Sequence, residues 1–312
     1  MHQSQFREKE SHEEEAVLAV DFLPDEDENS ARNCDDSEAC HADIGFMFDS
    51  ENDTLMRSFS FSPNTMSGEE SGMTINVQVQ SIDDDPGAVQ SGHYLWPAAP
   101  VLAQHLVDMF GCSSAKEDAE RSLVKESVHN VLELGAGCGL ASLVAMQIFP
   151  DLRQVILTDH DPGTLSLSEE NYDATCERLE ETDAEIAAKL PLLSFERLGW
   201  GEKDDIADIL SLITYPDDKS EPCNGKGGFD LVLGSDLIYC EDVVSPLIFT
   251  VARTLSKSNV GAKMIMTQSF PYESGTEDEI SRVCLECNLV RTVLSDKLTG
   301  GGIRVQTFHH KL

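Results

Sequence analysis

The amino-acid sequence predicts an α/β fold in which helices cover both faces of a mostly parallel sheet. Two observations support this prediction. From residue 128 onward, apolar runs typical of buried strands alternate with helix-like segments, and this order favours parallel strands joined by helical crossovers. In addition, a glycine-rich turn at residues 135–139 follows the first of these apolar runs. Open α/β sheets bind ligands at such carboxyl ends of strands.

A half-exposed strand and a helix are expected ahead of the alternating region. Residues 74–80 alternate apolar and polar side chains, and residues 97–110 place apolar side chains on one helical face. Within the alternating region, strands are expected at residues 130–134, 154–159, 193–198, 230–235 and 263–268, with a terminal pair at 289–294 and 304–309. Helices are expected at residues 140–149, 163–179, 242–255 and 277–287, and surface insertions at 182–190 and 215–228.

The charge distribution divides the chain into a tail and a domain. Of 57 acidic and 22 basic side chains, residues 1–90 contain 22 acidic and 4 basic ones. The first part of the chain also lacks sustained apolar patterns, so it cannot bury enough surface to offset its ordering entropy. We expect a disordered acidic tail at residues 1–72 and a folded domain at residues 73–312, opened by the strand and helix described above. Acidic surface disfavours nucleic acid as a partner and favours basic proteins.

Cysteine usage bears on the compartment. Nine cysteines are scattered along the chain, and its first residues contain no apolar segment of a secretory signal. This combination is typical of reduced thiols, so a cytoplasmic or nuclear location is expected. Cys284 and Cys287 form one C-x-x-C pair without a second pair, so we expect no metal site. No run approaches membrane-spanning length, and we expect a monomer that does not associate with membranes.

The glycine-rich turn distinguishes between classes of ligand. It contains Gly135, Ala136, Gly137 and Gly139 and is preceded by Glu133. A dinucleotide-binding turn, G-x-G-x-x-G, would have its third glycine at position 140, which is a leucine here. The pattern E-x-G-x-G-x-G resembles instead that of S-adenosylmethionine (AdoMet) methyltransferases of the Rossmann-like class. The resemblance implies that these five residues contact the cofactor, with the loop under its methionine part.

A second acidic position follows at the end of the next predicted strand. Asp159 stands about 20 residues after the turn, the distance at which such folds bind ribose hydroxyls. Asp161 is a near alternative for this role. The other interpretation is that Asp159 only caps the next helix, because Asp161 and Pro162 also resemble a helix start.

Three further motifs occur around this core. Residues 236–239 read D-L-I-Y after the fourth predicted strand, residues 92–99 read G-H-Y-L-W-P-A-A, and residues 198–201 read L-G-W-G. With the glycine turn, they resemble in order the motifs of the seven-strand protein methyltransferases that mostly modify lysine. That group includes the methyltransferases of calmodulin, valosin-containing protein and Hsp70 chaperones. The resemblance extends from residue 92 to the C-terminus and implies a seven-stranded Rossmann-like fold.

The resemblance also implies roles for individual residues. Trp96 would line the cofactor pocket, Trp200 would lie beside the adenine, and Ser235 would lie against the adenosine. For each tryptophan, the alternative is ordinary core packing. Asp236 is expected to orient the acceptor amine, with Tyr239 as an aromatic wall of the slot. The alternative for Asp236 is a helix N-cap.

The predicted activity is transfer of a methyl group from AdoMet to a protein lysine ε-amine by in-line displacement. An arginine or histidine acceptor, a small-molecule acceptor and a non-catalytic AdoMet-binding scaffold remain alternatives. Enzymes that methylate the amino group of adenine need an Asn/Asp-Pro-Pro-Tyr/Phe loop after the fourth strand. Here leucine and isoleucine occupy the two proline positions, which disfavours a nucleic-acid substrate.

Overall fold

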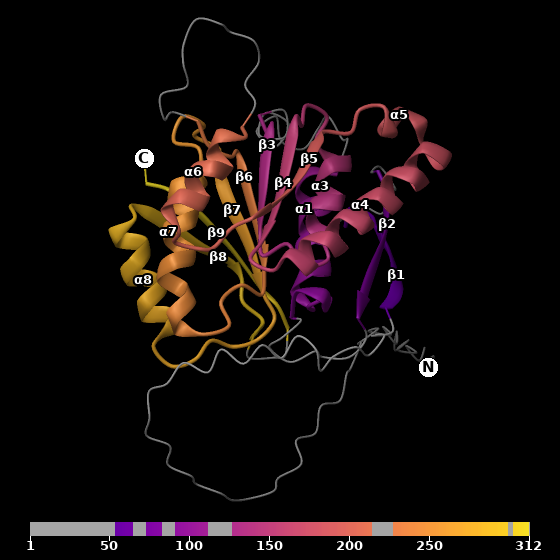
Figure 1. Ribbon diagram of the computed structural model, residues 1–312. Coiled ribbons are helices and arrows are strands. Elements are labelled where there is room, and N and C mark those ends of the chain that lie inside the picture. The colour runs from indigo at the N-terminus through magenta and orange to yellow at the C-terminus, as the bar shows by residue number, and fades with distance from the viewer. Residues whose placement is uncertain are drawn as a thin grey trace, which may run out of the picture. The chain divides into compact units, whose positions relative to one another are not determined.

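The computed structural model of the protein describes residues 54–64, 73–82, 91–111, 127–213, 227–298 and 302–311. Seven strands of these ranges form one sheet in the order β5-β4-β3-β6-β7-β9-β8 (Figure 1). Strand β9 runs antiparallel to both of its neighbours, whereas the other pairings in this sheet are parallel. The predicted seven-stranded, mostly parallel sheet is therefore confirmed. The strands are β3 (Asn130–Leu134), β4 (Gln154–Asp159), β5 (Leu192–Arg197), β6 (Leu231–Ser235), β7 (Lys263–Gln268), β8 (Leu289–Ser295) and β9 (Arg304–His310).

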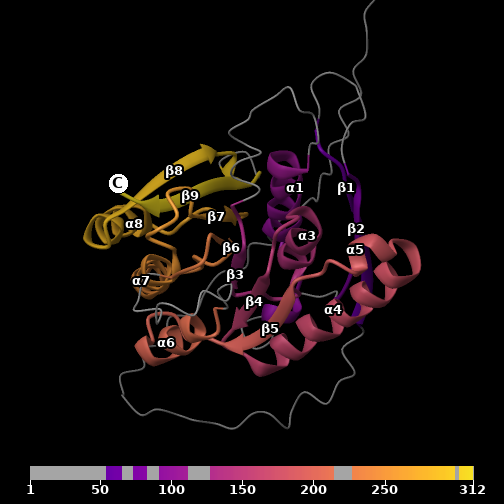
Figure 2. The same ribbon diagram turned by 90° about the horizontal axis from the view of Figure 1, so that it is seen from above.

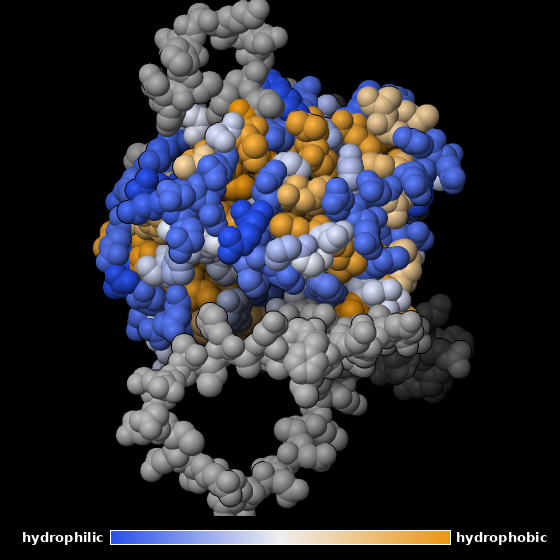
Figure 3. All heavy atoms as spheres, in the orientation of Figure 1, coloured by the Kyte–Doolittle hydropathy of each residue, from blue (hydrophilic) through white to orange (hydrophobic). Residues whose placement is uncertain are grey.

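Helices cover both faces of this sheet. In two perpendicular views, α1, α3 and α4 lie on one face and α6, α7 and α8 on the other (Figures 1 and 2). Hydrophilic residues predominate on the side of the molecule drawn in Figure 3, with smaller hydrophobic areas between them. The helices are α1 (Ala98–Phe110), α3 (Leu140–Ile148), α4 (Pro162–Thr182), α5 (Ala184–Ala187), α6 (Lys203–Ser211), α7 (Val244–Thr254) and α8 (Thr276–Glu286), with short 3-10 turns η1 (Ser91–His93) and η2 (Glu241–Val243).

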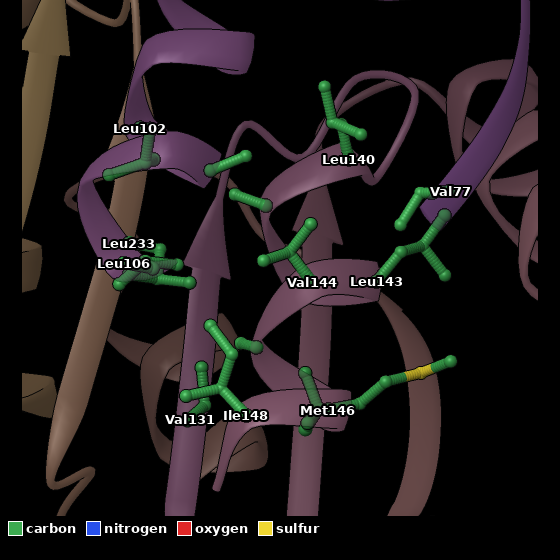
Figure 4. Packing of buried hydrophobic residues seen from close by; sticks show 14 of the residues in the cluster. Val77, Leu102, Leu106, Val131, Leu140, Leu143, Val144, Met146, Ile148 and Leu233 are labelled. Atoms are coloured by element: carbon green, nitrogen blue, oxygen red, sulfur yellow. The ribbon is translucent and has the colours of Figure 1, made fainter. Parts of the chain in front are cut away.

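The alternation of side chains along the central strands produces two cores. Val131 and Leu233 belong to a cluster with α1 and α3, which Figure 4 shows from close by. Leu132 and Val232, one position away on the same strands, belong to the cluster with α6, α7 and α8. Successive side chains of a strand point to opposite faces, and here both faces are covered. The central strands are therefore apolar on both sides, which explains their continuous apolar runs.

A two-stranded hairpin precedes the sheet and corrects the predicted tail boundary. Strand β1 (Thr54–Phe61) pairs antiparallel with β2 (Ile75–Ile82), and Phe61 is buried in the core. Asn171 of α4 binds the backbone N–H and C=O of Gln80 at 2.6 and 3.1 Å. Disorder of the whole range 1–72 is therefore wrong for β1, because its alternating side chains pack and its backbone pairs with β2. The remainder of the expected tail, apart from residues 62–64, lies outside the described residues.

Other differences concern connections between the strands. The strand predictions agree with the observed bounds to within one residue in the main sheet. Helix α6 was not expected, and the insertion predicted at 182–190 contains the short helix α5. The predicted helix 242–255 starts as the 3-10 turn η2 before α7 begins. Most of the expected insertion at 215–228 lies outside the described residues.

Two kinds of feature are absent from the described ranges. No helix there combines the length and apolarity needed to cross a membrane. The same residues contain no group of three or more His, Cys, Asp or Glu side chains that could hold a metal ion.

Candidate active site

Apart from Trp96, which precedes α1, the predicted site residues lie at or just after the carboxyl ends of the parallel strands, as expected for an α/β sheet. The glycine turn follows β3, Asp159 ends β4, the L-G-W-G turn follows β5, and the D-x-x-Y loop follows β6. Because β4, β3 and β6 are neighbours in the sheet, these loops lie along one edge. The topology thus brings together residues that are up to about a hundred positions apart in the sequence.

The glycine turn adopts a backbone that side chains would strain. Gly135, Gly137 and Gly139 have φ angles of 56°, 54° and 78°, a left-handed region that favours glycine. A Cβ on Gly135 would lie 2.8 Å from Leu237 Cδ2 and 3.4 Å from the Trp200 ring. The absence of side chains therefore lets the turn lie against both the D-x-x-Y loop and Trp200.

Glu133 precedes this turn in β3 and binds α3, the helix that follows the turn. Its side chain is 2% exposed, and its Oε2 accepts a hydrogen bond of 3.0 Å from the backbone N–H of Ser142 in the first turn of α3. Burial raises the pKa of the Glu133 carboxyl to about 7, against the opposing effect of the bond from Ser142. The contact that the structure gives Glu133 is thus with α3; a direct cofactor contact stays a prediction. Ala136 is also buried, and its N–H donates to Thr158 O at 2.9 Å.

Asp159 and Asp161 have different surroundings. Asp159 is buried; its carboxylate accepts from the N–H of Asp161 at 3.1 Å and of Gly137 at 3.4 Å, and His160 Nδ1 lies 3.1 Å away. Asp161 is the N-cap of α4, accepting from Gly163 N at 3.0 Å. The interpretation of Asp159 as a mere helix cap is therefore wrong, because Asp161 occupies that position. Asp159 instead links β4 to the glycine turn.

The segment at residues 91–96 crosses the glycine turn. A Cβ on Gly92 would lie 2.3 Å from the Thr164 hydroxyl, and one on Gly137 would lie 3.2 Å from Gly92 O. Trp96 is half-buried; its Nε1 donates to Ser91 O at 2.8 Å, and the rings of Tyr94 and Phe270 lie 5.3 and 6.2 Å from its own. The motif around Trp96 is thus folded back on itself beside the turn.

The L-G-W-G turn is held on two sides. The N–H of Gly199 donates to Asp205 Oδ2 of α6, and that of Gly201 to Thr250 Oγ1 of α7, both at 2.8 Å. Gly201 has a φ of 85°. These bonds fix the backbone on either side of Trp200, whose half-buried ring contacts the site of Gly135 as described above.

Asp236 is buried and bound to the protein on both carboxylate oxygens. Oδ1 accepts from Ser269 N at 2.6 Å, and Oδ2 accepts from Ser269 Oγ at 2.8 Å and from Ala98 N at 3.2 Å. Burial raises the pKa of the Asp236 carboxyl, and these three hydrogen bonds oppose the shift. The alternative that Asp236 caps the helix after its own loop is wrong, because its carboxylate meets the start of α1 instead. A contact with the acceptor amine stays a prediction.

Tyr239, in contrast, is open to solvent. Tyr239 is 62% exposed, so most of its ring is accessible to solvent. Partial burial raises the pKa of the Tyr239 hydroxyl, and negative charge on Cys240 and Asp159 raises it further. Tyr239 lies in the loop that follows β6, and Leu237 of the same loop lies next to Gly135. Ser235 is half-buried at the end of β6, opposite Thr267 of β7.

Three further residues of this region were not among those predicted from the sequence. Thr267 and Gln268 end β7, and Ser269 follows it; together they bind the D-x-x-Y loop and the start of α1. Their position in the sequence could have identified them. Three polar residues follow the apolar residues of β7, at the carboxyl end of the strand, where such sheets bind ligands.

Comparison with known proteins shows which proteins this chain is similar to. A family model described as lysine methyltransferase matches residues 76–275. The chain is 27% identical over 178 residues to a protein N-terminal and lysine N-methyltransferase, EFM7, of Gibberella zeae, covering 57% of this chain and 62% of that protein. It is 27% identical over 171 residues to the protein N-lysine methyltransferase METTL21A of Danio rerio, covering 53% of this chain and 56% of that protein. The match therefore spans less than two thirds of the length of either relative.

Proposed function

The chain belongs to the lysine methyltransferase family, and on that premise we propose that it transfers a methyl group from AdoMet to a lysine ε-amine of a protein substrate. One observation supports this most directly. The solvent-exposed Tyr239 stands on a loop adjoining the glycine turn, since Leu237 of the same loop limits the space at Gly135. An exposed aromatic side chain beside a cofactor loop is suited to a long amine that enters from outside.

Family membership implies AdoMet as the methyl donor, and the residues present fit it. The glycine turn offers backbone without Cβ atoms, which permits close approach of a ligand. Asp159 offers carboxylate oxygens suited to ribose hydroxyls, and the two tryptophans offer faces suited to apolar and aromatic parts. When bound, AdoMet supplies a methyl group on a positively charged sulfur. The residues proposed to hold it are Trp96, Glu133, Gly135, Ala136, Gly137, Gly139, Asp159, Trp200 and Ser235.

The protein's share of the chemistry is orientation and desolvation, because the methyl group is already activated. The acceptor amine has to lose its proton, and an apolar environment lowers the pKa of lysine. In this proposal the ring of Tyr239 forms one wall around the amine. A nearby carboxylate raises the pKa of a lysine, so Asp236 is suited to positioning and not to the removal of the proton.

The substrate is proposed to be a protein with a basic surface. The chain carries a net charge of −35, which attracts basic partners and repels nucleic acid. A cytoplasmic or nuclear location and a monomeric state complete the proposal. A second acceptor, a protein α-amine, is suggested by the description of EFM7 as acting on protein N-termini as well as on lysine.

The test uses the purified full chain, methyl-labelled AdoMet and a protein extract, followed by residue analysis of the labelled bands. Methyl-lysine in one or a few bands would support the proposal. Label on an α-amine, arginine or histidine would still indicate a protein methyltransferase, but one with a different acceptor group. Binding of AdoMet with label only in small molecules, or with no label transferred, would contradict the proposal in favour of a small-molecule enzyme or a scaffold.

A further inference from the structure

The end of β7 holds the D-x-x-Y loop at several points. Thr267 O accepts from the N–H of Asp236 at 2.9 Å, and Gln268 Nε2 donates to Ile238 O at 3.2 Å. Ser269 donates from both its N–H and its hydroxyl to the Asp236 carboxylate, at 2.6 and 2.8 Å. Three consecutive residues therefore bind the loop immediately before Tyr239. We name residues 267–269 the β7 brace.

The same brace binds the start of α1. Thr267 Oγ1 donates to Ala98 O at 3.0 Å, while the N–H of Ala98 donates to Asp236 Oδ2 at 3.2 Å. Ala98, Thr267 and Gln268 are all fully buried. Ala98 comes two positions after Trp96, and the Phe270 ring next to the brace lies 6.2 Å from the Trp96 ring. The brace thus joins the D-x-x-Y loop to the segment that crosses the glycine turn.

The conformation of Asp236 requires such support. Its φ of 54° is left-handed although it is not glycine. Non-glycine residues seldom adopt this backbone, although aspartate does so more often than most, and the surrounding bonds help to hold it. The bonds from Thr267, Ser269 and Ala98 converge on this one residue, and a change in its backbone would redirect everything that follows, including Tyr239.

We propose that the β7 brace, and Ser269 above all, is a positioning element that sets the place of Tyr239 through Asp236. Resting on the proposed function, this gives the Asp236 carboxylate a second role, in which its bonds to Ser269 and Ala98 fix the conformation of the loop that carries Tyr239. Thr267, Gln268 and Ser269 then affect turnover without touching either substrate.

The test compares Ser269→Ala with wild type in the full chain, using AdoMet and the labelled protein band as methyl acceptor. We expect kcat to fall by about tenfold or more, since a hydrogen bond to a charged group is lost, and Kd for AdoMet to stay within about threefold, since the Thr267–Ala98 bond remains. Ser269→Thr keeps the hydroxyl and is expected to restore most of kcat. Ser256→Ala is the matched control, because it removes the hydroxyl of a buried serine that binds Asn259 in another loop.

Hydrogen exchange provides a readout that needs no methyl acceptor. In Ser269→Ala the amides of Ala98 and Asp236 should exchange faster than in wild type, while those of Leu132 and Ile156 in the central strands stay unchanged. Equal exchange at Ala98 and Asp236, or a kcat like that of Ser256→Ala, would overturn the proposal. If Ser269→Ala does not fold, Gln268→Met removes the donor to Ile238 O at similar volume and takes its place. A wild-type protein that methylates no lysine would refute the proposed function, while the exchange data would still decide on the brace.

Discussion

The effect of a buried charge beside the glycine turn can be measured at Glu133 as a free energy of unfolding. Its carboxyl group is buried, and its pKa is raised from 4.5 to about 7. A carboxyl whose pKa is raised by folding stabilises the fold in its protonated form. That contribution is fully present below pH 4.5, declines as the pH rises to about 7, and is absent above. At about 1.4 kcal/mol per pKa unit, ionised Glu133 costs roughly 3 kcal/mol of folding free energy.

Replacing Glu133 by glutamine removes the charge and keeps an oxygen that can accept from Ser142 N. We expect the unfolding free energy of the variant, relative to wild type, to rise by roughly 3 kcal/mol between pH 4.5 and pH 8. The side-chain amide of the Glu133→Gln variant adds buried N–H groups. If these N–H groups find no acceptor, they would lower the unfolding free energy of the variant by about 1–2 kcal/mol. This offset is the same at each pH. The pH dependence of the difference is therefore the diagnostic quantity.

Urea denaturation between pH 4.5 and 8, followed by tryptophan fluorescence, provides the assay. AdoMet is left out, because a ligand that binds only the folded state would add its own stabilisation. Glu170→Gln on the exposed side of α4 is the control and should show no such pH dependence. A constant difference between Glu133→Gln and wild type from pH 4.5 to 8 would refute the assignment of a raised pKa to Glu133.

Three further predictions concern the loops around the site. Asp159→Ala should weaken AdoMet binding by about tenfold or more in calorimetry, because a charged acceptor for hydroxyl groups is lost. Tyr239→Ala should lower kcat by roughly tenfold or more and leave the melting temperature nearly unchanged, because an exposed side chain contributes little to stability. Gly135→Ala should destabilise the fold by about 1–3 kcal/mol in urea denaturation, because its Cβ would need a left-handed backbone and would lie 2.8 Å from Leu237.

Each of these has its own control. Asp161→Ala removes the N-cap of α4, so it should lower stability by about 1 kcal/mol with less effect on AdoMet affinity than Asp159→Ala. Tyr239→Phe keeps the ring and should retain most of kcat; a loss equal to that of Tyr239→Ala would assign the effect to the hydroxyl. For the glycine, Gly261→Ala lies in a turn with nothing nearer than 3.3 Å to the new Cβ. Equal losses at Gly261 and Gly135 would contradict the steric argument.

Much of the architecture could be predicted from local pattern. Runs of two or three consecutive apolar residues, buried on both faces, marked the central strands, and the glycines at alternate positions marked the turn after β3. Sequence periodicity was less informative for short elements at the surface and for strands whose partner is distant in the sequence. Helix α6 is short, with acidic residues in its first turn, and so resembles a surface loop. Strand β1 is largely exposed, so its own sequence gives a weak signal. It is stabilised by pairing with β2, from which it is separated in the sequence by intervening residues.

The candidate site likewise has features that the local sequence predicts and features that depend on distant contacts. The motifs and their order follow from residue types and spacing. So does the edge on which the motifs after β3, β4, β5 and β6 meet, because parallel strands carry their following loops to one side of a sheet. The partners of Asp236 do not follow from spacing. Ala98 lies 138 positions away and Ser269 lies 33 positions away, and no local rule connects them. Which side chain meets that buried carboxylate depends on how α1 packs across β6 and β7, and packing is a property of the folded chain as a whole.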